Sequence, residues 1–206
     1  MRITRANSNA IKHACLYFHY AKRIPAYSYA YNIYNSNDEW CGCILFGVGT
    51  VTNMPNFLNC EAGACLELQR VALNGKQGRN TTSKALSMAM REVKKDAVFL
   101  RCLFSYADTF QNHLGIIYQA TNWIYIGESS IENKYEVNGV YKHSKTIREL
   151  ATSKNISFTN YIKLNNFNII KGKIKYLYIY PYDKNIKKYI LTKQKPYPKR
   201  EIINEK

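Results

Sequence analysis

The stretch that most constrains the fold of this chain runs from residue 104 to 127 and reads FSYADTFQNHLGIIYQATNWIYIG. The almost unbroken apolar run before it, AVFLRCLF (97–104), predicts a buried strand. Small or polar-tipped residues end that run at 105–108, a short helix is expected at Tyr118–Gln119, and WIYIG (123–127) predicts a second strand. Polar groups at the end of a buried strand lie where open α/β sheets bind ligands. The pattern therefore predicts a functional site, and the alternative is a hydrogen-bonded polar corner between two strands.

The spacing of apolar residues predicts the other elements of the chain. A hydrophobic period of about 3.6 residues favours helices, and alternation of apolar and polar residues favours strands. Expected helices lie at 11–23, 81–95 and 146–152, and expected strands lie at 26–34, 40–52, 64–73 and 173–180, with a polar turn at 35–38 after the first strand. The first two of these strands are close enough in sequence to form a hairpin.

A glycine-rich basic loop, NGKQGRN (74–80), separates the strand at 64–73 from the helix at 81–95. Helix N-termini present unpaired N–H groups, so strand, loop and helix together make a generic anion cradle. Asn80 or Thr81 is expected to cap the helix. The candidate cofactor-binding residues are Gly78, Arg79, Asn80 and Ser83.

The chain carries a large and uneven positive charge. Lys and Arg outnumber Asp and Glu by 30 to 14, which gives a net charge of +16. Residues 1–140 hold 14 basic and 10 acidic side chains, and residues 141–206 hold 16 and 4. Such an excess favours a polyanionic partner such as nucleic acid, with a solvated lysine-rich face as the alternative. We therefore expect a core at 1–140 and a basic, Tyr/Lys-rich extension at 141–206 that packs on it and contributes to nucleic-acid binding.

The expected strand at 173–180 combines cations and aromatic rings with apolar residues. Cations suit phosphates and flat rings suit exposed bases, so this strand favours nucleic-acid binding. A cationic edge strand that resists aggregation is the alternative. The residues concerned are Lys173, Lys175, Tyr176, Tyr178 and Tyr180.

The six cysteines show no paired C-x-x-C spacing and the four histidines are scattered, so no metal site is expected. Cys102, inside the apolar run, is expected to behave as a small hydrophobe. The set favours a reduced, intracellular protein. Because no signal peptide and no apolar run of about 18 residues appears, we expect a soluble, cytoplasmic protein without a membrane partner.

Strand, glycine-containing loop, helix, apolar strand and the short helix ending in IYQATNWIYIG resemble the GNAT acyltransferase fold. The resemblance implies an α+β protein with a mixed, mostly antiparallel twisted sheet flanked by helices, and makes residues 1–140 the catalytic core. In that superfamily the loop before the long helix binds the pyrophosphate of an acyl donor. The loop of this chain, QGRN (77–80), departs from the usual Gln/Arg-x-x-Gly-x-Gly/Ala pattern.

A second resemblance is more specific. The segment Ser105–Asp108, His113-x-Gly115 followed by IYQATNW (117–123), and PYPK (196–199) resemble the phage Mom-type DNA modification proteins. By that resemblance the chain converts the exocyclic amino group of adenine in DNA to a carbamoylmethyl, glycinamide-like derivative, which protects the DNA against restriction. It implies double-stranded DNA as substrate, tRNA as a second candidate partner, and a phage-infected or lysogenic bacterial host.

The chemistry of that reaction gives roles to the polar residues. A conjugated exocyclic amine is a poor nucleophile, so Asp108 or His113 is expected to act as general base. The resemblance to the GNAT fold implies that Tyr118 protonates the leaving group. Ser105 is expected to hold the acyl oxygen. The target amine is hidden in a duplex, so adenine must be flipped out or already unstacked. Tyr106, Tyr118 or Trp123 is expected to stack on the adenine, and Gln119 and Asn122 are expected to form hydrogen bonds to its edge. Arg70 and Arg79 are expected to bind the anionic part of the donor. The alternative for these two arginines is ion pairing at the surface.

The carbon donor stays open between acetyl coenzyme A and a glycyl donor such as glycyl-tRNA. Two other functions also stay open: a GNAT N-acyltransferase acting on a protein or small amine, and a non-catalytic nucleic-acid-binding protein. The first explains the core but not the Mom-like segments or the basic tail. The second explains the charge but not the cluster of Asp, His and Tyr residues.

Overall fold

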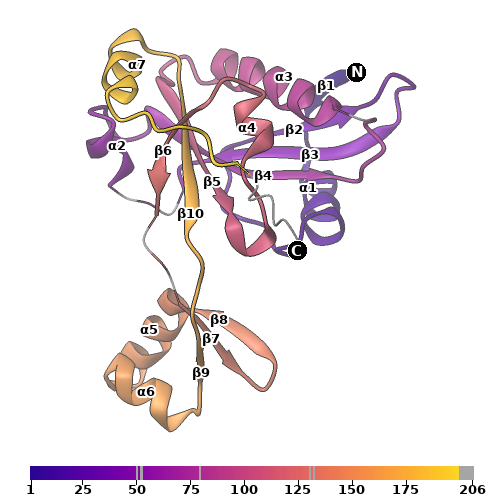
Figure 1. The fold of residues 1–206 in the computed structure, drawn as a ribbon. Helices are drawn as coiled ribbons and strands as arrows, with labels where there is room; N and C mark the ends of the chain where they lie inside the picture. Colours follow the sequence, from indigo (N-terminus) through magenta and orange to yellow (C-terminus); the bar gives the residue numbers. More distant parts are fainter. Residues whose placement is uncertain (50, 52, 79, 130, 132, 200–206) are drawn as a thin grey trace, which may run out of the picture.

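The computed structural model describes residues 1–49, 51, 53–78, 80–129, 131 and 133–199, and its main sheet has seven strands (Figure 1). Every neighbouring pair is antiparallel except β4 and β5, which are parallel. In spatial order the strands are β1 (Arg2–Arg5), β2 (Tyr29–Tyr34), β3 (Trp40–Gly47), β4 (Cys65–Leu73), β5 (Cys102–Asp108), β10 (Lys175–Pro181) and β6 (Ile124–Glu128). This confirms the expected α+β fold with a mixed, mostly antiparallel sheet, and the hairpin of β2 and β3.

Two helices cover one face of this sheet, α3 (Thr81–Asp96) and the short α4 (Ile116–Gln119) (Figure 1). The apolar stripe that predicted α3 is buried, because residues three and four apart share one side of a helix. It packs on Phe46 of β3 and Leu103 of β5. The buried residues of the stripe are Ala85, Leu86, Ala89, Met90 and Val93.

Three helices cover the opposite face. These are α1 (Ser8–His13), continued by a π-helical turn at Ala14–Phe18, together with α2 (Met54–Phe57) and α7 (Lys184–Leu191). Successive strand residues point to opposite faces, so Leu45 packs under α1 while its neighbour Phe46 packs under α3. In the described part of the chain, no helix has the length and apolar character needed to cross a membrane.

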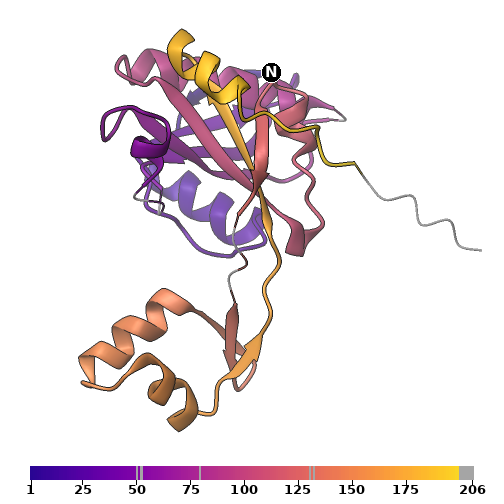
Figure 2. The same cartoon turned by 60° about the vertical axis from the view of Figure 1, so that its left-hand side comes forward.

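Residues 134–170 form a separate small unit with its own core. This unit lies below the main sheet and is joined to it by two chain segments (Figures 1 and 2). Its sheet has the order β8 (Val140–His143), β7 (Lys134–Val137) and β9 (Asn168–Ile170). Two helices, α5 (Ser144–Ser153) and α6 (Phe158–Leu164), complete it. The buried core of the unit is Tyr135, Ile147, Ala151, Tyr161, Ile162 and Phe167.

The structure therefore divides the chain differently from the expected boundary at 140/141. That boundary falls within β8, directly after its first residue, Val140. The Lys/Tyr strand, β10, is not part of an added extension: it lies inside the main sheet, between β5 and β6. It is also not an edge strand. Tyr178 is fully buried against Tyr118 and Tyr125, so much of the aromatic content of β10 builds the core.

The apolar run at 97–104 was predicted as one buried strand, and this is wrong for its first half. The side chains of Val98 and Phe99 are 77% and 58% exposed. They lie in a turn after α3, which Lys94 stabilises by donating hydrogen bonds to the carbonyls of Val98 (2.9 Å) and Leu100 (2.6 Å). The strand starts at Cys102 and continues through Asp108, so the polar residues expected in a loop lie within the strand itself.

Gly115, at the start of α4, has a φ of +77°, and a Cβ there would lie 2.4 Å from the ring of Tyr178. Gly115→Ala should lower the free energy of unfolding by about 2–4 kcal/mol, because backbone strain adds to overpacking of a buried ring. Gly75→Ala is the matched control, since Gly75 has a φ of +86° but open space around it. The control should lose only about 1 kcal/mol. Urea denaturation measures both, and equal losses would show that the close approach to Tyr178 is unimportant.

Candidate active site

The main sheet opens between the parallel strands β4 and β5. In the described chain these strands pair only over Cys65–Glu67 and Cys102–Phe104. On its other edge β4 carries an extra residue, Gln69, because successive residues of β3 pair with Arg70 and then with Leu68. Such a β-bulge bends its strand, so β4 turns away from β5 at this point. The separated strands border a cleft of about 1140 Å³.

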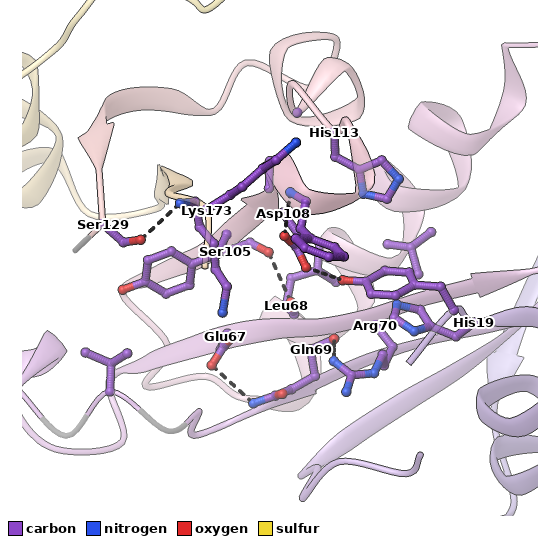
Figure 3. Close-up of a pocket in the computed structure, with 18 of the residues that line it drawn as sticks. His19, Glu67, Leu68, Gln69, Arg70, Ser105, Asp108, His113, Ser129 and Lys173 are labelled. Carbon is purple, nitrogen blue, oxygen red and sulfur yellow. Dashed lines mark hydrogen bonds between the residues drawn. The ribbon is translucent and has the colours of Figure 1, made fainter. Parts of the chain in front are cut away.

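Six of the residues predicted to carry chemistry line the cleft (Figure 3). They come from β4, from β5 and from the segment that follows β5. The predicted residues that line it are Arg70, Ser105, Tyr106, Asp108, His113 and Tyr118.

Ser105 and Tyr118 form a buried hydrogen-bonded pair at the point where the strands separate. The Ser105 Oγ lies 3.1 Å from the carbonyl oxygen of Leu68 and 2.9 Å from the Tyr118 hydroxyl. A serine hydroxyl has one proton to donate. Because that proton satisfies the Leu68 carbonyl, the Tyr118 hydroxyl donates to Ser105. Burial raises the pKa of Tyr118 to about 12, so the phenol is protonated at neutral pH and is a proton donor facing the cleft.

Asp108 lies at the end of β5, on the rim of the same cleft (Figure 3). Its carboxylate accepts hydrogen bonds from the backbone N–H of Phe110 (2.9 Å) and from the hydroxyl of Tyr20 (3.5 Å). The ring of Tyr20 in turn contacts His113 edge-on, with centroids 5.9 Å apart. The two predicted general-base candidates, Asp108 and His113, are therefore held on either side of one tyrosine.

Arg70 brings a poorly compensated positive charge into the cleft. Its Nη1 donates to the carbonyl of Gln69 (2.5 Å), but its buried Nε has no hydrogen-bond partner. Burial and the neighbouring Arg23 lower the pKa of the Arg70 guanidinium. None of the ion pairs between described residues includes Arg70. A half-buried cation in this condition is suited to bind an anionic ligand.

His19 also lines the cleft and is held neutral. Its Nδ1 accepts a hydrogen bond from the backbone N–H of Ala21 (3.1 Å), and its ring stacks on Tyr20 at 4.4 Å. Burial, with the positive charges of Arg70 and His113, lowers the pKa of His19 to about 4. The sequence indicated no more than a packing role for this residue.

Several lining residues were not singled out from the sequence as site residues. Glu67 stands in the last β4–β5 pair before the opening, and its carboxylate accepts a hydrogen bond from Gln69 Nε2 (3.3 Å). A lone carboxylate within the apolar run ACLELQRVAL was the available signal. Tyr20 and Arg23 come from the N-terminal segment, and nothing in the sequence indicates that they meet β5. Lys173 and Lys175, which the sequence analysis connected with nucleic-acid binding, also line the cleft.

Three predicted substrate-binding residues do not line the cleft. Trp123 is 0% exposed and packs between Tyr118 (5.1 Å) and Tyr180 (5.9 Å), so no base can stack on it in this structure. Gln119 donates to the carbonyl of Leu114 and to the hydroxyl of Tyr178, both inside the fold. Asn122 is exposed in the turn between α4 and β6 and has a φ of +61°. The IYQATNW block thus supports the site by packing α4 under it.

The predicted anion cradle before α3 lies apart from the cleft, since none of its described residues lines that space. Asn80 stands at the N-cap position with a φ of +58° but makes no side-chain cap bond. Thr81 instead donates to the carbonyls of Gln77 and Gly78. The hydroxyl of Ser83 donates a long hydrogen bond to the Asn80 carbonyl (3.4 Å). Arg79 lies outside the described residues, and binding of a cofactor by this loop stays a prediction.

The low pKa of His19 makes the stability of the fold depend on pH. The unfolded chain takes up a proton near pH 6.5 and the folded chain only near pH 4. Stability is therefore complete above about pH 6.5 and falls as the pH drops toward 4. His19→Gln should make the loss of unfolding free energy between pH 7 and pH 5 smaller by roughly 1 kcal/mol. This value is reduced to allow for the partial exposure of the ring. Urea denaturation at pH 7 and pH 5 measures it, with His13→Gln as the control; equal pH dependence in wild type and His19→Gln would contradict the account.

Comparison with known proteins agrees with this architecture. Two solved structures resemble the chain: a variant of the spermidine N-acetyltransferase SpeG from Vibrio cholerae (TM-score 0.52, 7% identity, 88% of this chain and 95% of the other), and a phosphinothricin N-acetyltransferase homologue (TM-score 0.51, 9% identity, 89% and 99%). Identities this low show the fold alone, which is that of the GNAT acetyltransferases.

Two sequence comparisons are more specific. The chain is 27% identical over 187 residues to the methylcarbamoylase Mom of Escherichia phage Mu, covering 88% of this chain and 76% of that protein. The model of the Mom protein family matches residues 1–199. Two of the segments that carried the resemblance to that family in the sequence touch one another, because the hydroxyl of Tyr197 donates to the carbonyl of Trp123 (2.7 Å). The chain therefore belongs to the Mom protein family.

Proposed function

We propose that this chain is a transferase that modifies the exocyclic amine of adenine in DNA with a carbamoylmethyl group and so protects the DNA against restriction. Membership of the Mom family and likeness to a protein named methylcarbamoylase support DNA modification by group transfer. The observation that carries the proposal is the cleft between β4 and β5. It combines a carboxylate, a protonated buried phenol and an arginine without an ionic partner among the described residues.

Asp108 is the proposed general base. The lone pair of the adenine amine is delocalised into the ring, so its proton must leave as the new bond forms. The carboxylate of Asp108 is held at the rim by the Phe110 N–H and by Tyr20, which leaves lone pairs to accept that proton. His113, which contacts the other edge of Tyr20, is the alternative base.

Tyr118 is the proposed general acid. Attack of the amine on an acyl donor forms an amide bond and breaks the thioester or ester bond of the donor, so the leaving thiolate or sugar oxygen needs a proton. A glycyl ester would give a glycyl adduct, which contains every atom of the carbamoylmethyl group and becomes it by rearrangement, whereas acetyl coenzyme A supplies no nitrogen and would give an acetyl adduct. When the Tyr118 phenol gives up its proton, the Ser105 hydroxyl can turn from the Leu68 carbonyl and donate to the phenolate. This pair therefore stabilises the charge that develops on Tyr118. In this arrangement Ser105 stabilises the phenolate of Tyr118. Contact of Ser105 with the acyl oxygen is a further proposed role.

Arg70 and Arg23 are the proposed binding groups for the anionic part of an acyl donor. Acetyl coenzyme A and glycyl-tRNA both carry phosphates, and a guanidinium binds phosphate with two parallel hydrogen bonds. The unpartnered Nε of Arg70 is available for one of them. The two arginines would thus bind the phosphates that both donors carry. Experiment must decide which donor is used.

The proposed nucleic-acid surface is the rim of the cleft. Lys173 and Lys175 line it and belong to the third of the chain that holds most of the positive charge. Double-stranded DNA must present an extruded adenine, because the amine lies inside the stacked duplex. Tyr106 lines the cleft on β5 and is the proposed stacking partner of that base, since aromatic rings stack on any base face.

The test is nucleoside mass spectrometry of plasmid DNA from cells that express the chain. Wild type should yield a heavier deoxyadenosine. Asp108→Asn and Tyr118→Phe should each reduce its yield at least about 100-fold, the usual effect of losing a general acid or base. Asp38→Asn, which alters an exposed ion pair with Arg2, is the matched control and should keep full activity. Glycyl and carbamoylmethyl adducts are isomers, so fragmentation against synthetic standards must identify the product.

Other outcomes would replace the proposal. Unmodified DNA together with acetylated protein or polyamine would favour a plain N-acyltransferase. DNA binding without a modified base, with any donor, would favour a non-catalytic nucleic-acid-binding protein. Full activity of both Asp108→Asn and Tyr118→Phe would remove the cleft from the mechanism.

A further inference from the structure

Three cysteines that the mechanism does not use converge at the closed end of the cleft. Cys65 on β4 and Cys102 on β5 are paired across the parallel strands, and Cys60 lies in the loop that follows α2. Their three sulfur atoms lie within 4.8 Å of one another. All three are free thiols. We propose that Cys60, Cys65 and Cys102 form a binding site for a single zinc ion.

The geometry of the cluster is close to that of a zinc site. Zinc–sulfur bonds of about 2.3 Å place tetrahedral ligands roughly 3.8 Å apart, so the sulfurs of this cluster need to approach one another by about 1 Å at most. Soft thiolate ligands select zinc, copper(I) or iron–sulfur clusters over magnesium or calcium. Three sulfurs around one ion leave a single tetrahedral position, which suits zinc with one further ligand.

The surroundings offer an entry path and a fourth ligand. Cys65 and Cys102 are 2% and 0% exposed, whereas Cys60 is partly exposed and lines a shallow side cavity of about 360 Å³. Glu61 and Arg101 line the same cavity. Water or the Glu61 carboxylate would fill the remaining position. Three thiolates on Zn²⁺ carry one net negative charge, which the guanidinium of Arg101 at the cavity offsets while it also pairs with Asp183 (3.1 Å).

The three cysteines would bind the ion as thiolates, because the thiolate and not the thiol is the metal ligand. Zinc binding would release the three thiol protons, so affinity should rise with pH.

The position of the site gives it a structural role. Cys65 and Cys102 are the first residue pair of β4 and β5, and the strands separate after the third pair. An ion there would fix the closed end of the opening and join it to the loop after α2. Nothing in the sequence indicated the site, because the three residues show no C-x-x-C spacing and are brought together by the pairing of β4 with β5 and by the loop after α2.

The test is zinc titration of the reduced, metal-free full-length chain. One Zn²⁺ per chain should bind in competition with a chromogenic chelator, and the melting temperature should rise with zinc. Co²⁺ in place of zinc should give sulfur-to-metal charge-transfer absorption. Cys60→Ser and Cys102→Ala should each weaken zinc binding at least about tenfold, and Cys43→Ala, a buried cysteine outside the cluster, should not.

Cys60→Ser keeps the test valid if Cys102→Ala fails to fold, because Cys60 is partly exposed and serine retains its size. A folded wild-type chain that binds no stoichiometric zinc would overturn the proposal. So would zinc binding by Cys60→Ser with wild-type affinity and an unchanged Co²⁺ spectrum.

Discussion

A single extra residue in β4 determines how this molecule presents its chemistry. Parallel pairing with β5 ends after Glu67 and Phe104, and the bulge at Gln69 bends β4 toward β3 and away from β5. Backbone and side-chain groups of the two strands therefore face an open space in the middle of the sheet. In a continuous sheet, strand pairing would occupy the backbone groups. Ser105 illustrates the consequence, since its hydroxyl satisfies the Leu68 carbonyl from across the opening.

Burial sets the chemistry of several groups in the opening. Burial keeps Tyr118 protonated and His19 neutral, and disfavours the charge on Arg70, whose Nε has no partner. A ligand with an anionic group would offset the energetic cost of burying the charge of Arg70. The same region carries Asp108 at its solvent side. Proton donor, proton acceptor and anion-binding group are thus separated by depth within one cleft.

The sequence predicted what local pattern encodes. The α3 stripe, the β2–β3 hairpin and the cluster from Ser105 to Tyr118 are all local, so periodicity and spacing located them. Pairing of β10 between β5 and β6 is not local, and an alternating Lys/Tyr strand gives no sign of its neighbours. Aromatic residues were also ambiguous, because Trp123 and Tyr106 are equally suited to stack on a base and only tertiary packing buries the former. For the same reason Tyr20 and Glu67 were missed as members of the site.

We propose that adenine reacts in the opening between β4 and β5. A crystal structure of the chain with an oligonucleotide that carries an unpaired adenine would test this. We expect an extruded adenine in the opening, with its exocyclic amine between the Asp108 carboxylate and the Tyr118 hydroxyl. An adenine bound elsewhere, for example at the loop before α3, with the opening free of nucleic acid would contradict it.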